Sequence, residues 1–273
     1  MSEALGQSPA HAYLVAGGGG GMRSTIILRM LAEELTERKI PYTAIEGIQG
    51  TGKDQRVHVP SQQVHDMLAD IAERPKDAPI LLIAHCIGTV AGLQTLEKIA
   101  DERPAGLVAI APPLPSPLHT IMTPQSSKKR SKDDTLMRVV DLPPGAVDYS
   151  VMTESQAHLS PQYFADIAAA DDLAFRLRAR VELGNAAAIA PEYDWNVESP
   201  RTVADWHKKW QHVAPADELT MLKQRAVLVP NAAHGLYISP RSGMEITPDA
   251  DTRFQAQNVN HAVDVGLELI AQR

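Results

Sequence analysis

The segment around residue 86 constrains the fold of this chain more tightly than any other. Residues 80–84, Ile-Leu-Leu-Ile-Ala, form a short apolar run of the kind that is buried on both faces of a parallel sheet. The only cysteine of the 273 residues, Cys86, follows this run, and a stretch rich in small residues comes next. A side chain on a sharp strand-to-helix turn leaves room only for Ala or Gly two positions before and after it, where Ala84 and Gly88 stand. The pattern therefore predicts a buried strand that turns sharply into a helix at Cys86.

The rest of the chain alternates short β-rich apolar runs with helical patterns, which is typical of parallel βαβ units. We predict strands over residues 12–16, 42–46, 80–84, 106–111, 185–190 and 226–230. Helices are expected over residues 24–38, 61–74, 89–101, 201–212 and 255–271. The last helix should pack on the sheet, because it keeps apolar residues at helical spacing: Val259, Val263, Leu267 and Ile270. The predicted fold class is α/β, with a mostly parallel sheet flanked by helices.

Composition narrows the class of protein. Hydrophobic residues make up 44% of the chain and charged residues 22%, which are ordinary values for a globular domain with a sizeable core. The net charge of −7 argues against nucleic-acid binding. One cysteine cannot form an intrachain disulfide, the polar N-terminus has no signal-peptide pattern, and no apolar run is long enough to span a bilayer. We expect a cytoplasmic protein with no cofactor, no metal, no nucleic-acid partner and no membrane span; the sequence does not indicate an oligomeric state.

The predicted turn matches the nucleophile-elbow pattern Gly-x-Ser-x-Gly, with Ala84 for the first glycine and Cys86 for the serine. The helix that begins there directs backbone N–H groups and the positive end of its dipole at Cys86, which favours a thiolate. A free cysteine is also common as a small buried apolar residue. The strand and helix around it favour the interpretation of Cys86 as a nucleophile.

A cysteine nucleophile needs a base, and the base needs an acid that orients it. The predicted strand 226–230 runs into a loop with a His-Gly pair at His234, from which an imidazole can reach the elbow. The preceding strand, 185–190, leads into a loop with two carboxylates, Glu192 and Asp194. We predict His234 as the base and Asp194 as the acid, with Glu192 as the alternative acid. Asp194 also has the interpretation of an exposed turn residue or a helix N-cap.

Five consecutive glycines, residues 17–21, follow the first predicted strand and precede a helix. Glycine allows the backbone of such a loop to approach a substrate closely, and a flexible turn is the alternative interpretation. A dinucleotide-binding loop does not fit, because Met22 breaks the Gly-x-Gly-x-x-Gly spacing. Residues 47–53 match most of a phosphate-binding loop, but Asp54 replaces the required Ser or Thr. We interpret that segment as an ordinary loop.

Residues 112–180 break the alternation of strands and helices. The segment begins with a proline-rich run and continues with a basic tract at 126–132, which is typical of a solvated loop, with a docking patch as the alternative. Two helices are expected within it, over residues 134–140 and 161–178. The sequence therefore predicts a core made of residues 1–111 and 181–273, interrupted by an insertion at 112–180.

Taken together, these features resemble the α/β-hydrolase superfamily over nearly the whole chain. The elbow at Cys86 and the His-Gly loop at His234 are the more specific matches, and the order nucleophile, acid, histidine is that of this superfamily. The resemblance implies the α/β-hydrolase fold, with residues 112–180 as a helical cap over the active site. It also implies an oxyanion hole formed by the N–H groups of Gly18 (or Gly19) and Ile87.

Cysteine at the elbow resembles dienelactone hydrolases, a subset of thioesterase-like enzymes and the Cys-type Dieckmann cyclases. The resemblance implies an acyl-transfer hydrolase of the thioesterase or esterase type, working through an acyl-enzyme on Cys86. Its substrate would be a small acyl compound, either free or held as a thioester on a carrier. Three alternatives stay open: a cyclase or acyltransferase that releases the chain by intramolecular attack, a hydrolase-like protein that binds ligand without turnover, and a serine enzyme whose nucleophile was exchanged for cysteine.

Overall fold

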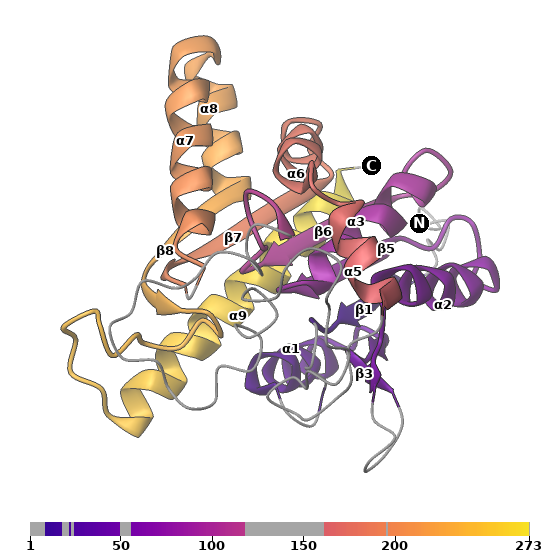
Figure 1. Ribbon diagram of the computed structural model, residues 1–273, viewed down its shortest axis with the longest axis horizontal. Helices are drawn as coiled ribbons and strands as arrows, with labels where there is room; N and C mark the ends of the chain where they lie inside the picture. The colour runs from indigo at the N-terminus through magenta and orange to yellow at the C-terminus, as the bar shows by residue number, and fades with distance from the viewer. Residues whose placement is uncertain are drawn as a thin grey trace, which may run out of the picture.

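A sheet of six strands forms the centre of the computed structural model, which describes residues 9–17, 22, 25–49, 56–117, 161–194 and 196–272 (Figure 1). The strand order is β2-β1-β5-β6-β7-β8, and every neighbouring pair is parallel. All six predicted strands are confirmed, with ends that shift by a few residues. Their bounds are β1 (His11–Val15), β2 (Tyr42–Ile45), β5 (Ile80–His85), β6 (Ala105–Ile110), β7 (Ala186–Tyr193) and β8 (Ala226–Ala233).

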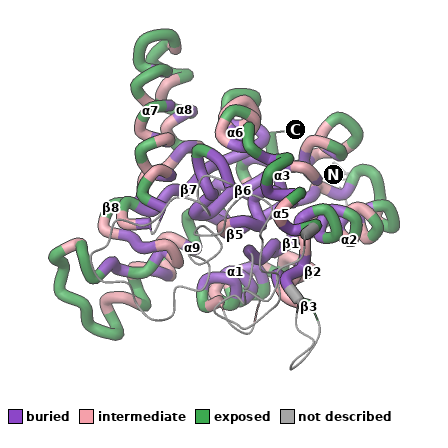
Figure 2. Tube along the Cα trace, in the orientation of Figure 1, coloured by how far each residue is buried: buried purple, intermediate pink, exposed green. Residues whose placement is uncertain are grey.

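Helices cover both faces of this sheet. Successive side chains of each strand point to opposite faces, so each face is apolar and is buried under helices. Tyr13 and Val15 of β1 lie in one cluster, whereas Ala12 and Leu14 lie in the other. The first cluster is covered by α2 (Pro60–Ala72), α3 (Gly88–Ile99) and α6 (Leu173–Glu182), and the second by α1 (Ile26–Glu37) and α9 (Pro248–Ala271). Figure 2 shows buried strands between helices that are each exposed on one side. The predicted α/β class is confirmed.

Two helices between β7 and β8 form a hairpin that packs on these two strands and projects beyond the edge of the sheet (Figure 1). The first, α7 (Glu198–Val213), contains the predicted helix 201–212. The second, α8 (Ala216–Arg225), was not predicted, although its charges suit the helix dipole: Asp217 and Glu218 in the first turn, Lys223 and Arg225 in the last. No helix among the described residues combines the length and the apolar character that crossing a bilayer requires.

A small antiparallel hairpin also differs from the prediction of a loop near residue 47. Strand β3 (Ile48–Gln49) pairs with β4 (Arg56–Val57), and residues 50–55 between them lie outside the described part of the chain. Strands of two residues are too short to produce the alternating pattern from which strands are recognised.

The predicted single helix over residues 161–178 is wrong. The structure has two helices there, α5 (Pro161–Ala168) and α6, which begins at Leu173. Asp171 and Asp172 lie at the break, and aspartate is a poor residue for a helix interior because its side chain competes for local hydrogen bonds. The hydroxyl of Ser116 donates a hydrogen bond to the carboxylate of Asp171, which fixes the break against the start of the insertion.

Part of the predicted cap, residues 112–117 and 161–180, belongs to the described chain. Helix α5 packs on α2, and α6 contacts β7 and α8. The predicted helix 134–140 and the basic tract 126–132 lie outside the described residues. The division of the chain into a core and a cap stays a prediction.

Candidate active site

Cys86 lies at the turn between β5 and α3. Its φ of 56° falls in the left-handed region, which residues with a side chain rarely adopt. The N–H of Cys86 donates to the carbonyl oxygen of Ile110 at 2.9 Å, which ties the turn to the end of β6. The side chain is partly exposed, although the strand that leads to it is buried. A strained backbone that presents one reactive side chain points to function.

Two glycines allow the chain to close around this turn. A Cβ at Gly88 would lie 2.6 Å from the carbonyl oxygen of Val15 and 2.8 Å from that of Ala16, so no side chain fits there. A Cβ at Gly17 would lie 2.9 Å from the Cβ of Cys86. The steric argument from the sequence covers Gly88. It did not reach Gly17, because its contact with Cys86 joins two segments far apart in the chain.

His234 and Asp194 follow two neighbouring strands, β8 and β7, and meet at the carboxyl edge of the sheet. Nδ1 of His234 lies 2.9 Å from Oδ1 of Asp194. A carboxylate oxygen accepts, so Nδ1 donates, which leaves Nε2 of the imidazole for a partner on the other side. Asp194 is 0% exposed, and the N–H of Asn196 donates to the same oxygen at 3.1 Å. Asp194 is therefore a buried, oriented carboxylate and not an exposed turn residue. It is also not the N-cap of α7, because Val197 has that position.

Glu192, the alternative acid, has a different partner. One of its carboxylate oxygens accepts the N–H of Asn231 at 2.8 Å, which links the last residues of β7 to those of β8. The structure thus brings Asp194, and not Glu192, to the imidazole of His234.

The charge state of His234 depends on its two neighbours. Burial by itself lowers the pKa of this imidazole, but the negative charges of Asp194 and Cys86 stabilise the imidazolium. Both side chains also form hydrogen bonds to the ring, and the balance raises the pKa of His234 to about 10. Cys86, His234 and Asp194 therefore form one connected group, in which His234 is a positively charged imidazolium at neutral pH.

His85, next to Cys86 in the chain, was not singled out from the sequence. Its Nε2 lies 3.3 Å from the carbonyl oxygen of His234, and the two rings are 4.7 Å apart. Burial, followed by repulsion from the charged ring of His234, lowers the pKa of His85 to about 3. His85 thus stays neutral and supports the loop that carries His234 without adding a second positive charge.

The predicted oxyanion donors are only partly described. Ile87 lies at the start of α3, and no acceptor among the described residues takes its N–H. A Cβ at Gly17 would approach this nitrogen to 3.3 Å, so the glycine loop begins directly beside it. Gly18 and Gly19 lie outside the described residues. The pair of donors stays a prediction.

Arg241 binds the backbone at Tyr193 and Asp194, the segment that carries the predicted acid. Its guanidinium donates to the carbonyl oxygens of Tyr193 at 3.0 Å and Asp194 at 3.5 Å, and it lies 5.6 Å from the centre of the Tyr193 ring. A cavity of about 610 Å³ lies next to Arg241, between residues 192–194, α7 and β8. Neither Cys86 nor His234 lines it. Within the described chain, no group of three or more His, Cys, Asp or Glu residues is placed to hold a metal ion.

Solved structures of similar fold include hydrolases. Est1E from Butyrivibrio proteoclasticus, with ferulic acid bound, is 14% identical, with a TM-score of 0.51 over 99% of this chain and 93% of that chain. A pyrethroid hydrolase from Sphingobium faniae is 13% identical, with a TM-score of 0.51 over 94% of this chain and 98% of that chain. No family model matches the sequence, and the comparison with curated proteins gives no match. The parallel sheet flanked by helices is the α/β-hydrolase fold, as the resemblance implied.

Proposed function

We propose that this chain is an acyl-transfer enzyme of the thioesterase or esterase type. In this proposal Cys86 is the nucleophile, His234 carries protons, and Asp194 orients the imidazole. The proposal rests on one observation: a cysteine in a left-handed turn is linked to a histidine whose other ring nitrogen contacts a buried carboxylate. Covalent acyl transfer requires such a nucleophile, base and orienting group. The pyrethroid hydrolase of the same fold supports a hydrolytic reaction.

In the acylation step the sulfur of Cys86 attacks the carbonyl carbon of an ester or thioester. A C–S bond forms while the carbonyl electron pair moves to oxygen, and the N–H of Ile87, with the predicted N–H of Gly18, stabilises the oxyanion. The oxyanion then collapses and the bond to the leaving group breaks. His234 donates its Nε2 proton to the departing oxygen or sulfur.

In the hydrolytic release step the neutral imidazole of His234 removes a proton from water as the water oxygen attacks the acyl carbon. The C–S bond breaks, the carboxylic acid leaves, and the sulfur electron pair returns to Cys86. Asp194 keeps Nε2 directed at the reacting atoms by accepting the hydrogen bond from Nδ1.

The thiol favours a second reaction at the same site. A thioester is more reactive than an oxygen ester, so the acyl group on Cys86 can also be released by a nucleophile within the substrate or on a second molecule. Such a cyclase or acyltransferase would take its acyl group from a small-molecule or carrier-bound thioester. Cys86 is a free cysteine, which suits a reducing compartment, and we place the reaction in the cytoplasm.

Intact-mass measurement during turnover of acyl thioesters of increasing chain length tests the proposal. The protein should gain the mass of one acyl group transiently and release the thiol. Cys86→Ala should lower turnover by about 10⁴-fold or more while the protein still unfolds in a cooperative thermal transition. Cys86→Ser, which keeps a smaller nucleophile at the turn, is the matched control and should still accept the acyl group.

Other outcomes of this measurement would contradict the proposal. Turnover that survives Cys86→Ala would remove the cysteine from the reaction. An acyl adduct that never turns over would indicate a trapped form, as expected for a serine enzyme with an exchanged nucleophile. Binding of the thioester without adduct or turnover would indicate a ligand-binding protein.

A further inference from the structure

The cavity beside Arg241 is large enough for a ligand of its own. Its volume of about 610 Å³ lies within the range of about 300–1,000 Å³ that is typical of small-molecule sites. Its walls come from the end of β7, from α7, from the edge strand β8 and from the loop after β8 (Figure 1). Of the three residues of the candidate active site, only Asp194 borders it. A ligand in this cavity would therefore be distinct from an acyl group on Cys86.

One side of the cavity is apolar and partly open to water. Pro200 and Ala204 lie one turn apart on α7, and Leu228 and Pro230 lie two residues apart on β8, so each pair shares a face of its element. Val197, which directly precedes α7, is 48% exposed. Apolar side chains that remain exposed in a concave surface favour the binding of an apolar group.

Arg241 brings a positive charge to the cavity, and no carboxylate of the described chain pairs with it. Its Nη2 donates to the carbonyl oxygens of Tyr193 at 3.0 Å and Asp194 at 3.5 Å. A guanidinium carries five N–H groups, and neither Nε nor Nη1 of Arg241 has a hydrogen-bond partner within the described residues. Donors of a charged group therefore remain for a ligand.

The two carboxylates that border the cavity have partners elsewhere. Glu192 accepts the N–H of Asn231 at 2.8 Å. Asp194 is 0% exposed and contacts the charged ring of His234 at 2.9 Å. Neither carboxylate forms an ion pair with Arg241, so the positive charge of this arginine is not cancelled inside the cavity.

A second arginine lies on the same cavity. Arg201, near the start of α7, pairs with Glu198 at 2.7 Å, and the two side chains are 70% and 35% exposed. Exposed pairs of this kind contribute little free energy, so a ligand can compete with Glu198 for Arg201. The two arginines together favour an anion over a neutral or cationic ligand.

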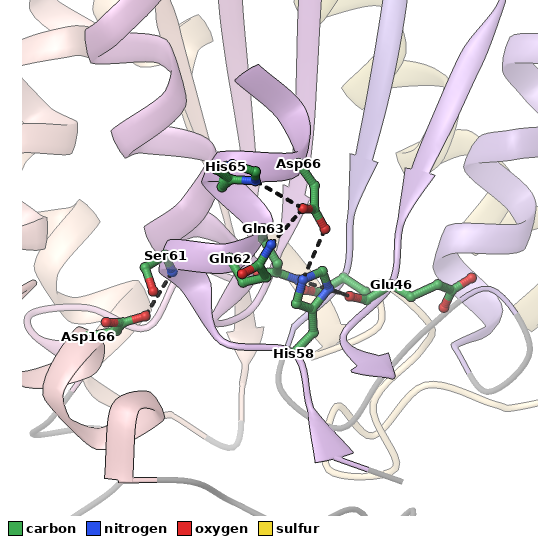
Figure 3. Close-up of polar contacts among 9 residues, drawn as sticks. Glu46, His58, Ser61, Gln62, Gln63, His65, Asp66 and Asp166 are labelled. Atoms are coloured by element: carbon green, nitrogen blue, oxygen red, sulfur yellow. Dashed lines mark hydrogen bonds and ion pairs between the residues drawn. The ribbon is translucent and has the colours of Figure 1, made fainter. Parts of the chain in front are cut away.

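The polar cluster around the start of α2 shows the opposite situation (Figure 3). Oδ2 of Asp166 accepts the N–H of Ser61 at 2.7 Å, and Oδ2 of Asp66 lies 3.3 Å from Nε2 of His58. Groups of the chain itself thus meet the charges of these carboxylates. At Arg241 the positive charge meets only carbonyl oxygens and an aromatic ring.

We propose that this cavity binds a small organic anion, a carboxylate with an apolar body. The carboxylate accepts charge-assisted hydrogen bonds from the guanidinium of Arg241, and the apolar body lies against Ala204 and Leu228. Binding is noncovalent. The proposal goes beyond the proposed function and does not require that Cys86 is a nucleophile.

Isothermal titration with phenylbutyrate tests the proposal, and the neutral phenylbutyramide is the matched ligand. The carboxylate should bind about tenfold more tightly than the amide or better, because the amide lacks the charge that Arg241 pairs with. Arg241→Gln should weaken binding of the carboxylate by about tenfold or more and leave the affinity for the amide unchanged. Arg253→Gln, an exposed arginine on α9, is the control and should change neither affinity.

Two further measurements locate the ligand. A carboxylate could also bind at the candidate active site, as a product of hydrolysis would. Alkylation of Cys86 with iodoacetamide should therefore leave the affinity for phenylbutyrate unchanged. Ala204→Phe, which fills the cavity from α7, should abolish binding although both arginines remain. Cooperative thermal unfolding of each variant shows that its fold is intact.

The contrary outcomes are distinct from those that test the acyl-enzyme. Equal affinity for the carboxylate and the amide would overturn the proposed ligand class. Loss of binding on alkylation of Cys86, or binding that persists in a folded Ala204→Phe variant, would place the ligand elsewhere and overturn the site. Absence of binding to the unaltered protein would overturn the proposal as a whole and would leave the acyl-enzyme on Cys86 untouched.

Discussion

Polar clusters centred on histidine lie at opposite ends of the parallel sheet. At the amino end, Nε2 of His11 lies 2.9 Å from the hydroxyl of Thr43, and Tyr13 donates a hydrogen bond to the carboxylate of Asp70. Arg74 donates to the hydroxyl of Tyr13 at 2.7 Å and pairs with the same carboxylate at 2.6 Å. These groups lie on strands β1 and β2 and at the end of α2. At the carboxyl end, the cluster around His234 lies instead on a left-handed turn and two loops.

The pKa of histidine is shifted in opposite directions at the two ends of the sheet. Burial, and then repulsion from Arg74, lower the pKa of His11 to about 4, although Asp70 acts in the other direction. At the carboxyl end the charges of Asp194 and Cys86 outweigh burial and raise the pKa of His234 to about 10. At the amino end the positive charge of Arg74 is paired with the negative charge of Asp70, and His11 stays neutral at neutral pH. The loops at the carboxyl end hold a protonated ring beside the proposed nucleophile, and strongly shifted pKa values of this kind are typical of catalytic sites.

The largest expected difference lies between the two carboxylates at the carboxyl end of β7, Glu192 and Asp194. Asp194→Asn should lower turnover by about 10³-fold or more. The neutral amide removes the negative charge that stabilises the imidazolium of His234, and it no longer fixes the orientation of the ring. Glu192→Gln, two residues away, should change turnover only a few-fold, since Glu192 contacts the backbone of Asn231. Steady-state turnover of one thioester by both variants measures the contrast. Equal losses would show that the acid has been assigned wrongly.

The pH dependence of stability should differ in sign between the two histidines. The folded pKa of His11 lies below the unfolded value of about 6.5, so its contribution is present above pH 6.5 and is lost as pH falls towards 4. The folded pKa of His234 lies above it, so its contribution is present below pH 6.5 and is lost as pH rises through 10.

Urea unfolding from pH 4 to pH 10 measures both effects. His11→Asn should flatten the acid side of the stability profile and His234→Asn the alkaline side, each by about 1–2 kcal/mol once solvent screening is included. If both variants altered the same side, the contrast between the two clusters would be lost.

The smallest expected effect concerns the amino end. Tyr13→Phe should lower the free energy of unfolding by about 1–2 kcal/mol, because it removes a buried hydroxyl that is bonded to Asp70 and Arg74. Turnover should stay unchanged, since this cluster lies away from Cys86. Urea unfolding and turnover of the same preparation are the measurements, with Tyr42→Phe as the control. A loss of turnover at constant stability would mean that the amino end takes part in the reaction.

Most of the fold followed from local patterns, and the exceptions have physical reasons. The six strands and five of the helices have apolar periodicity that a short window contains. Helix α8 was missed because most of it is exposed, so its apolar pattern is weak. The break between α5 and α6 lies at Asp171 and Asp172, and Asp171 also accepts a hydrogen bond from Ser116, a distant partner that no short window includes.

The candidate site divides in the same way. Cys86, His234 and Asp194 were selected from strand ends and turn residues, and the structure brings them together. Gly17 carries no local signal of its proximity to Cys86, because its place depends on how β1 lies beside β5.

The sequence by itself determined that this chain alternates strands and helices and turns sharply at a cysteine, because adjacent residues decide periodicity and the room around a turn. The tertiary structure decided which carboxylate reaches the imidazole. In a regular strand Glu192 and Asp194 would face the same side. The register shift between β7 and β8 at Pro191 and Tyr193, and the turn that follows, give them different partners. That shift exists only because β7 and β8 are neighbours in the folded sheet.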